Sequence, residues 1–135
     1  MKIMIVEDEA LLALELEEEV EAAGHLVIGQ AMNRTKALAI LEDQKPEFAF
    51  VDVHLTDGPT GLDVGKHLAE CGIPYVFVTG NLKRIPEDFV GALGVIEKPY
   101  TMNCLQNALD YIARHLRGDV GLAAPPSLIV APSVA

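Results

Sequence analysis

The stretch Phe48-Ala49-Phe50-Val51-Asp52-Val53-His54-Leu55 decides the fold of this 135-residue chain. Its aromatic and β-branched residues are typical of a buried strand, yet Asp52 places a carboxylate near the end of that strand. Burying a charged group is costly unless a partner compensates the charge. Asp52 is therefore either a cap or turn anchor, or a group that performs chemistry.

Short apolar runs alternate with segments of helical periodicity on both sides of this stretch. We predict strands at 3–6, 26–29, 48–53 and 75–78 and from 95, and helices at 10–23, from Asn33 to before Pro46, from Thr60 to Gly72, and from about Thr101. Prolines and glycines within 82–94 allow at most a short, weak helix there. This alternation predicts an α/β fold with a parallel sheet, right-handed crossovers and helices on both faces.

The composition changes after Gly118, where the chain becomes rich in Gly, Ala and Pro. We predict one domain over 1–117 and a tail over 118–135, in which the apolar segment Leu128-Ile129-Val130 docks on this domain or on a partner. The size of the chain also favours one domain.

Charge and composition narrow the possible partners and the location. A formal net charge of -10 argues against nucleic-acid binding, which needs clustered lysines and arginines. It also argues against anionic membranes, and the apolar runs are too short to span a bilayer. The spacing of Cys71 and Cys104 matches neither a metal nor a redox pair, and acids follow the start too early for a secretory signal, so we expect free thiols and a cytoplasmic protein.

Polar residues occupy four of the five predicted strand ends. Glu7 and Asp8 follow the first strand, Asp52 ends the third, Thr79 follows the fourth and Lys98 the fifth. Ligands of such sheets bind at the carboxyl ends of the strands. Carboxylates a few ångströms apart repel by roughly 4 kcal/mol per pair, so a hard cation is expected among them, and Mg²⁺ prefers this kind of site.

The chemistry follows from the residue types at these ends. Each residue alone has an ordinary explanation, as a cap, a turn residue or a solvated lysine. Together, a carboxylate, a metal, a lysine and a hydroxyl suit acyl-phosphate chemistry. The sequence therefore predicts Asp52 as a phosphoryl acceptor, with Thr79 and Lys98 stabilising the phosphoryl group.

Over about residues 2–117 the chain resembles the receiver domain of two-component response regulators. The motifs that carry the resemblance are "IVEDE" (Glu7, Asp8), "FVDVHLTDGPTGLD" (Asp52), "IPYVFVTGN" (Thr79) and "EKPY" (Lys98, Pro99). The resemblance implies a flavodoxin-like sheet of order 2-1-3-4-5 and phosphorylation of Asp52 by a histidine kinase or a histidine phosphotransfer protein. It further implies Mg²⁺ bound by Glu7, Asp8, Asp52 and the His54 carbonyl, and a cis peptide bond before Pro99.

Two details refine the resemblance. The "PYVFVTG" stretch is similar to single-domain receivers of alphaproteobacteria with a Phe-Ala-Thr-Gly motif, which implies kinases of the HWE or related class. Val95 stands where the family usually carries an aromatic switch residue. We therefore expect order–disorder of residues 80–94 to carry the output, through a partner surface at 82–117.

Two rival functions remain open at this point. A haloacid-dehalogenase-like phosphohydrolase would carry a second acid two residues after the nucleophile, where this chain has His54. An unphosphorylated scaffold would not need the phosphorylation-site residue types. The favoured interpretation is a stand-alone phosphoacceptor, monomeric or weakly dimeric, that binds partners or drains phosphoryl groups and does not turn over a substrate.

Overall fold

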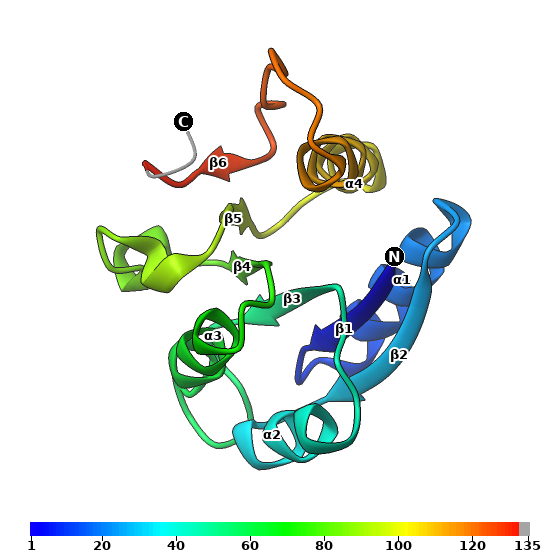
Figure 1. Ribbon diagram of the computed structural model, residues 1–135. Coiled ribbons are helices and arrows are strands. Elements are labelled where there is room, and N and C mark those ends of the chain that lie inside the picture. The colour runs from blue at the N-terminus through cyan, green and yellow to red at the C-terminus, as the bar shows by residue number, and fades with distance from the viewer. Residues whose placement is uncertain (133–135) are drawn as a thin grey trace.

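Five parallel strands form the centre of the structure, and a sixth, antiparallel strand extends one edge (Figure 1). The computed structural model describes residues 1–132. The strand order is β2-β1-β3-β4-β5-β6, so the predicted order 2-1-3-4-5 is confirmed. The strands are β1 (Lys2–Val6), β2 (Leu26–Ala31), β3 (Phe48–Asp52), β4 (Tyr75–Thr79), β5 (Gly94–Glu97) and β6 (Ile129–Val130).

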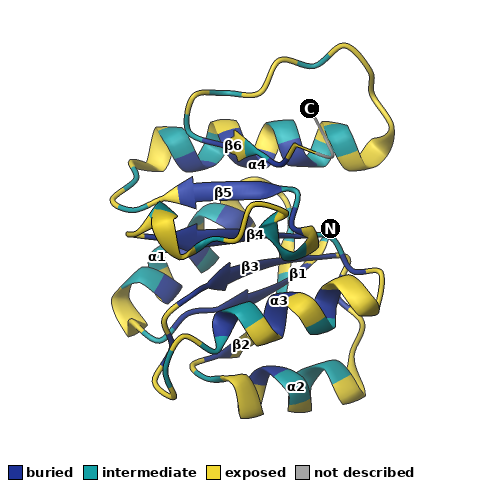
Figure 2. Ribbon diagram, turned by 90° about the vertical axis from the view of Figure 1, so that its left-hand side faces the viewer, coloured by how far each residue is buried: buried dark blue, intermediate teal, exposed yellow. Residues whose placement is uncertain are grey.

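Helices cover both faces of the sheet, as the alternation predicts. The helices α1 (Ala10–Ala22) and α4 (Met102–Arg117) pack on one face, and α2 (Arg34–Asp43) and α3 (Gly61–Glu70) pack on the other. Figure 2 shows the buried strands between these helical layers, whose outer surfaces are exposed. The strands β1, β3 and β4 are apolar almost throughout, because side chains on both of their faces enter a core.

Side chains at the helix starts explain where two helices begin. The Asn33 side chain accepts a hydrogen bond from the Lys36 amide at 2.8 Å, as predicted, and Thr101 accepts one from the Cys104 amide at 3.1 Å. The predicted cap at Thr60 is wrong. Its hydroxyl donates to Asp57 Oδ1 at 2.5 Å, because the backbone of Thr60 is already helical and turns the side chain away from the α3 amides.

The connection from β4 to β5 contains only two short 3₁₀ turns, η1 (Leu82–Arg84) and η2 (Phe89–Gly91). The prediction of a short, weak fourth helix is therefore confirmed. Phe89 and Val90 have φ values of 55° and 51°, in the left-handed region. Residues other than glycine adopt this backbone conformation at an energetic cost, and a β-branched residue such as Val90 is an outlier there.

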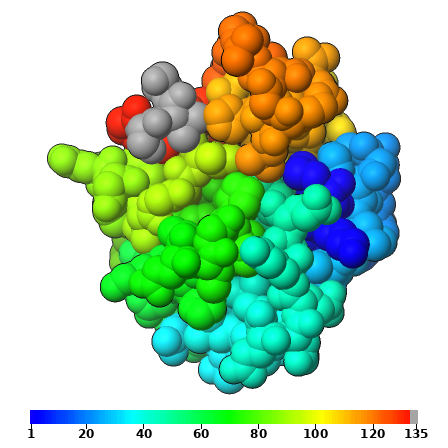
Figure 3. All heavy atoms as spheres, in the orientation of Figure 1, coloured from blue at the N-terminus to red at the C-terminus, as the bar shows by residue number. Residues whose placement is uncertain are grey.

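The sixth strand comes from the predicted tail. Ile129 pairs with Val95 and Val130 with Gly94, while Leu128 is only 4% exposed and joins the core beneath α4. Docking of this segment on its own domain is thus confirmed, and the prediction of five strands lacked one. Figure 3 shows the C-terminal segment (orange to red) closing this side of the molecule beside the yellow-green residues before β5.

The domain boundary after residue 117 stays a prediction, although the sheet recruits a strand from beyond it. The last three residues of the predicted tail, 133–135, lie outside the described residues. Within residues 1–132, none of the helices is both long and apolar enough to cross a membrane. The thiols of Cys71 and Cys104 form no disulfide within the same range.

Candidate functional site at the carboxyl edge of the sheet

Three carboxylates converge where β1 and β3 end. One carboxylate oxygen from each of Glu7, Asp8 and Asp52 lies within 4.8 Å of the other two. The convergence follows from the strand register, because Val6 pairs with Val51 and the next residue of each strand carries an acid. Glu7 and Asp52 are 5% and 6% exposed and are shielded from water, whereas Asp8 is partly exposed.

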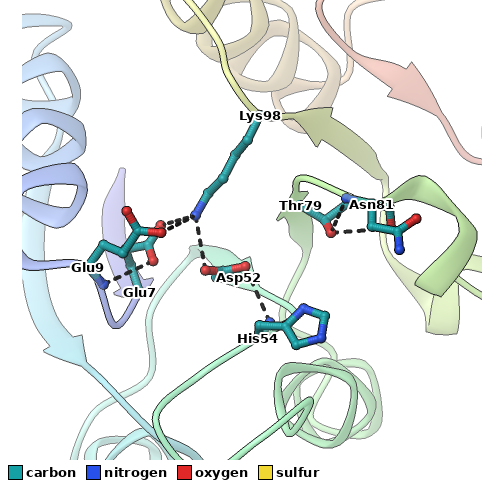
Figure 4. Close-up of polar contacts among 7 residues, drawn as sticks. All are labelled: Glu7, Glu9, Asp52, His54, Thr79, Asn81 and Lys98. Carbon is teal, nitrogen blue, oxygen red and sulfur yellow. Dashed lines mark hydrogen bonds and ion pairs between the residues drawn. The ribbon is translucent and has the colours of Figure 1, made fainter.

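Lys98 brings the only ammonium group seen in this cluster among residues 1–132. It follows β5, and its Nζ lies 2.8 Å from Glu7 Oε1 and 3.0 Å from Asp52 Oδ2 (Figure 4). The more exposed Glu9 lies at 3.9 Å from the same nitrogen. The Lys98–Pro99 peptide bond is cis. The ends of three strands therefore meet through one lysine.

The pKa values show how the charges affect one another. Burial, reinforced by the contact with Asp52, raises the pKa of Glu7, and Lys98 only partly offsets this. Burial and the neighbouring Glu7 also raise the pKa of Asp8. Burial lowers the pKa of Lys98, but its bonds to Glu7 and Asp52 outweigh burial and raise that pKa. The cluster thus holds more negative charge than one lysine balances, which favours a further cation.

Thr79 lies at the same edge of the sheet, but its hydroxyl is engaged elsewhere. The side chain is buried at the end of β4. Its Oγ1 accepts a hydrogen bond from the Asn81 amide at 3.1 Å and lies 3.4 Å from the Asn81 carbonyl oxygen (Figure 4). The structure therefore connects Thr79 to the loop that follows it, and not to the carboxylate cluster.

His54 contributes to the site through its backbone. Its amide donates to Asp52 Oδ1 at 3.4 Å, and the residue as a whole is exposed. Of the predicted residues, the structure brings together Glu7, Asp8, Asp52 and Lys98 by their side chains, and His54 by its amide. The role of the His54 carbonyl as a ligand stays a prediction.

Gly61, the first residue of α3, supports the site through a close contact that its sequence motif does not reveal. A Cβ atom on Gly61 would lie 1.9 Å from the Asp52 carbonyl oxygen and 2.7 Å from Val53 Cα. The Gly61 amide donates to the Val53 carbonyl at 3.0 Å. This close approach holds the end of β3, and hence Asp52, against the helix. The motif Gly58-Pro59-Thr60-Gly61 indicated only a turn, since contact with β3 is not visible in a local pattern.

Comparison with known proteins agrees with this geometry. Residues 3–110 match the model of the response regulator receiver domain. The phyllosphere-induced regulator PhyR of Methylorubrum extorquens is 42% identical over 85 residues, which cover 62% of this chain and 32% of that protein. This chain therefore spans only about a third of the length of that relative.

Solved structures show the same fold. The chain shares 27% identity and a TM-score of 0.73 with the PhyR receiver domain of Erythrobacter litoralis, over 92% of this chain and 95% of that one. SdrG from Sphingomonas melonis Fr1 is 34% identical with a TM-score of 0.66, over 82% of this chain and 93% of that one.

Proposed function

Because this chain belongs to the response regulator receiver domain family, we propose that Asp52 accepts a phosphoryl group from a phosphohistidine. The donor would be a histidine kinase, of the HWE or related class, or a histidine phosphotransfer protein. The observation that carries this proposal is the convergence of Glu7, Asp8 and Asp52 around the Lys98 ammonium at the carboxyl edge of the sheet.

The donor atoms suit Mg²⁺. The cluster offers three carboxylate oxygens from separate residues, and Mg²⁺ is a hard cation that binds one or two such groups together with water and phosphate oxygens. Glu7, Asp8 and Asp52, with the His54 carbonyl, would hold the ion. When bound, it supplies positive charge that neutralises the phosphoryl oxygens.

The transfer itself needs little from the protein beyond position and charge. An Asp52 carboxylate oxygen forms a bond to phosphorus while the P–N bond of the phosphohistidine breaks, and the electron pair of that bond stays on the imidazole nitrogen. Lys98 Nζ already lies 3.0 Å from Asp52 Oδ2, so it can donate to an oxygen of the new acyl phosphate.

The output follows from the added charge. A phosphoryl group brings about -1.5 to -2 charges and three acceptor oxygens. If the Thr79 hydroxyl turns to one of these oxygens, the Asn81 amide loses its acceptor and the loop after β4 changes. We propose that the partner surface lies within residues 82–117, and that the protein signals by binding there or acts as a phosphoryl sink.

Replacing Asp52 tests the acceptor. With acetyl phosphate and Mg²⁺, the wild-type protein should gain one phosphoryl group by intact-protein mass spectrometry, and Asp52→Asn should gain none. Asp63→Asn, at an exposed carboxylate of α3, is the matched control and should label normally. Stoichiometric labelling of Asp52→Asn would contradict the proposal.

Removing the metal tests the ligand set. Chelation should abolish labelling, and Mg²⁺ at ten times its dissociation constant should stabilise the native protein by about 1.4 kcal/mol. Asp8→Asn, which removes the least buried of the three carboxylates, should lose most of this stabilisation in thermal unfolding. An unchanged Mg²⁺ effect in this variant would remove Asp8 from the site.

A further inference from the structure

Tyr75 at the start of β4 makes a long-range contact that the proposed chemistry does not use. The residue is 0% exposed, and its hydroxyl donates to the Val90 carbonyl at 2.5 Å. Burial raises the pKa of Tyr75, so the phenol stays protonated and able to donate. A core strand is therefore tied to the η2 turn by one partly buried side-chain hydrogen bond.

The path of the phenol is fixed by its neighbours. A Cβ atom on Gly65 of α3 would lie 2.6 Å from the Tyr75 hydroxyl and 2.8 Å from the Phe77 ring. Phe77 packs edge-on against Tyr75 with ring centroids 5.1 Å apart. The absence of a side chain at Gly65 thus leaves the space through which Tyr75 reaches Val90.

The accepting turn is the strained part of the backbone. Val90 and Phe89 both have positive φ, and Val90 is β-branched. Such conformations persist where the surrounding structure holds them in place. Two hydrogen bonds hold the backbone of Val90, in addition to the packing of its side chain on the core: the exposed Asp88 side chain accepts from its amide at 3.0 Å, and the buried Tyr75 hydroxyl donates to its carbonyl.

The other end of the same segment is attached to the same strand. Tyr75, Phe77 and Thr79 point to one face of β4, because alternate residues of a strand share a face. Thr79 holds the Asn81 amide, and Tyr75 holds the Val90 carbonyl. The hydroxyls of Thr79 and Tyr75 on β4 therefore hold the two ends of residues 81–90. This loop lies beside α3 and is yellow-green in Figure 1.

We propose that Tyr75 is a positioning residue, which fixes the far end of residues 81–90 while the near end responds to phosphorylation. The anchoring of the far end by Tyr75 concerns the unmodified protein, whereas the response of the near end rests on the proposed function. The segment pivots at Val90 when Thr79 releases Asn81. Tyr75 thereby determines which surface the segment presents to a partner.

Hydrogen exchange of the unmodified protein tests the anchor. The amides of Gly91 and Ala92 bond within η2, to Asp88 and Phe89, and report its order. Tyr75→Phe should speed their exchange about five- to tenfold, the effect of losing one hydrogen bond. Tyr111→Phe, on α4 at the opposite face of the sheet, should leave both amides unchanged. Unchanged exchange in Tyr75→Phe would overturn the proposal.

A second variant separates anchoring from general loss of packing. Val90→Gly adopts positive φ at little cost, so it removes the larger part of the strain that the tether holds, although Phe89 keeps its positive φ. Adding Tyr75→Phe to Val90→Gly should then speed exchange at Ala92 less than twofold. An effect as large as in the wild-type background would show that the hydroxyl does not hold the strained turn.

Phosphorylation completes the test. Tyr75→Phe should be labelled at Asp52 to the wild-type level, since the phenol does not contact the site. In the labelled wild type, the exchange rates should change for the amides of 81–84 but by less than twofold for those of 91–92. In labelled Tyr75→Phe, the exchange rates should change in both regions. Equal changes in both regions of the wild type would refute the pivot. Absence of labelling in both proteins would refute the phosphoacceptor function and the half of the proposal that concerns phosphorylation. The anchoring of Val90 by Tyr75 is decided separately, by hydrogen exchange of the unmodified protein.

Discussion

The loops that follow β3 and β4 lie at the same edge of the sheet, but they are fastened in different ways. After β3, backbone groups contact each other directly: Gly61 packs on the Asp52 carbonyl, and Leu55 and Gly58 exchange hydrogen bonds of 2.8 and 3.1 Å. After β4, side-chain hydroxyls of Thr79 and Tyr75 hold a loop with two residues in the left-handed region.

Under the proposed function, this difference suits the two loops to different tasks. A backbone contact without space for one more carbon cannot adjust, so it suits the loop that must keep Asp52 in position. A hydroxyl can exchange one acceptor or donor for another by rotating about a single bond, so it suits the loop that must change. Because β3 and β4 are neighbours, the proposed acceptor lies next to the loop that we propose responds to it.

A glycine-to-alanine substitution in each of the two loops should give the largest difference in the free energy of unfolding. Gly61→Ala forces a Cβ atom into the Asp52 carbonyl, so we expect a loss of at least about 3 kcal/mol in the free energy of unfolding. Gly80→Ala has open space around its Cβ position and should stay within about 0.5 kcal/mol of the wild type. Urea denaturation measures both, and similar values would contradict the comparison.

The segment around β6 contacts the end of the loop between β4 and β5. Removing the buried Leu128 side chain, directly before β6, should lower the free energy of unfolding by an intermediate amount. The Ala131 amide donates to the Leu93 carbonyl at 2.9 Å, directly before β5. Leu128→Ala should cost about 2 kcal/mol, because it leaves a cavity beneath α4. Val120→Ala, at a residue that is 91% exposed, is the control.

Hydrogen exchange should then locate the effect of Leu128→Ala. Faster exchange is expected at 82–95 and not at 53–61, and labelling of Asp52 should persist. Loss of Mg²⁺-dependent labelling would instead show that the C-terminal strand supports the acidic cluster.

Replacing a threonine hydroxyl by a methyl group should give the smallest change in the free energy of unfolding. Thr79→Val leaves the Asn81 amide without its acceptor and should cost about 1 kcal/mol. Thr60→Val removes only an exposed contact with Asp57 and should not change stability measurably. Thermal unfolding of both variants tests this, and a larger loss for Thr60→Val would mean that the first loop also depends on hydroxyl groups.

The alternation of apolar runs and helical segments predicted the parallel sheet, whereas the resemblance to receiver domains predicted its strand order, and the convergence at the sheet edge follows from both. Apolar runs reveal parallel strands, and acids directly after two of them, Glu7 and Asp52, must meet when these strands are neighbours. The ranges of most elements differ from the prediction by one or two residues.

The features that escaped prediction depend on contacts between distant segments. The strand at 129–130 exists because β5 offers an open edge, and two residues carry no periodicity. The spaces left by Gly61 and Gly65 are defined by β3 and by Tyr75. Thr60 looked like a helix cap in the sequence, yet Asp57 competes successfully for its hydroxyl.

The antiparallel strand β6 also has a consequence for how copies of this protein meet. Without it, the backbone of β5 would present a row of unpaired amides and carbonyls with apolar side chains, a template for strand addition between molecules. The strand that takes its place is two residues long and lies between Pro126 and Pro132, which have no amide hydrogen to offer. The C-terminal segment, whose composition suggested only a tail, thus covers part of this edge with a strand that itself offers little for further pairing.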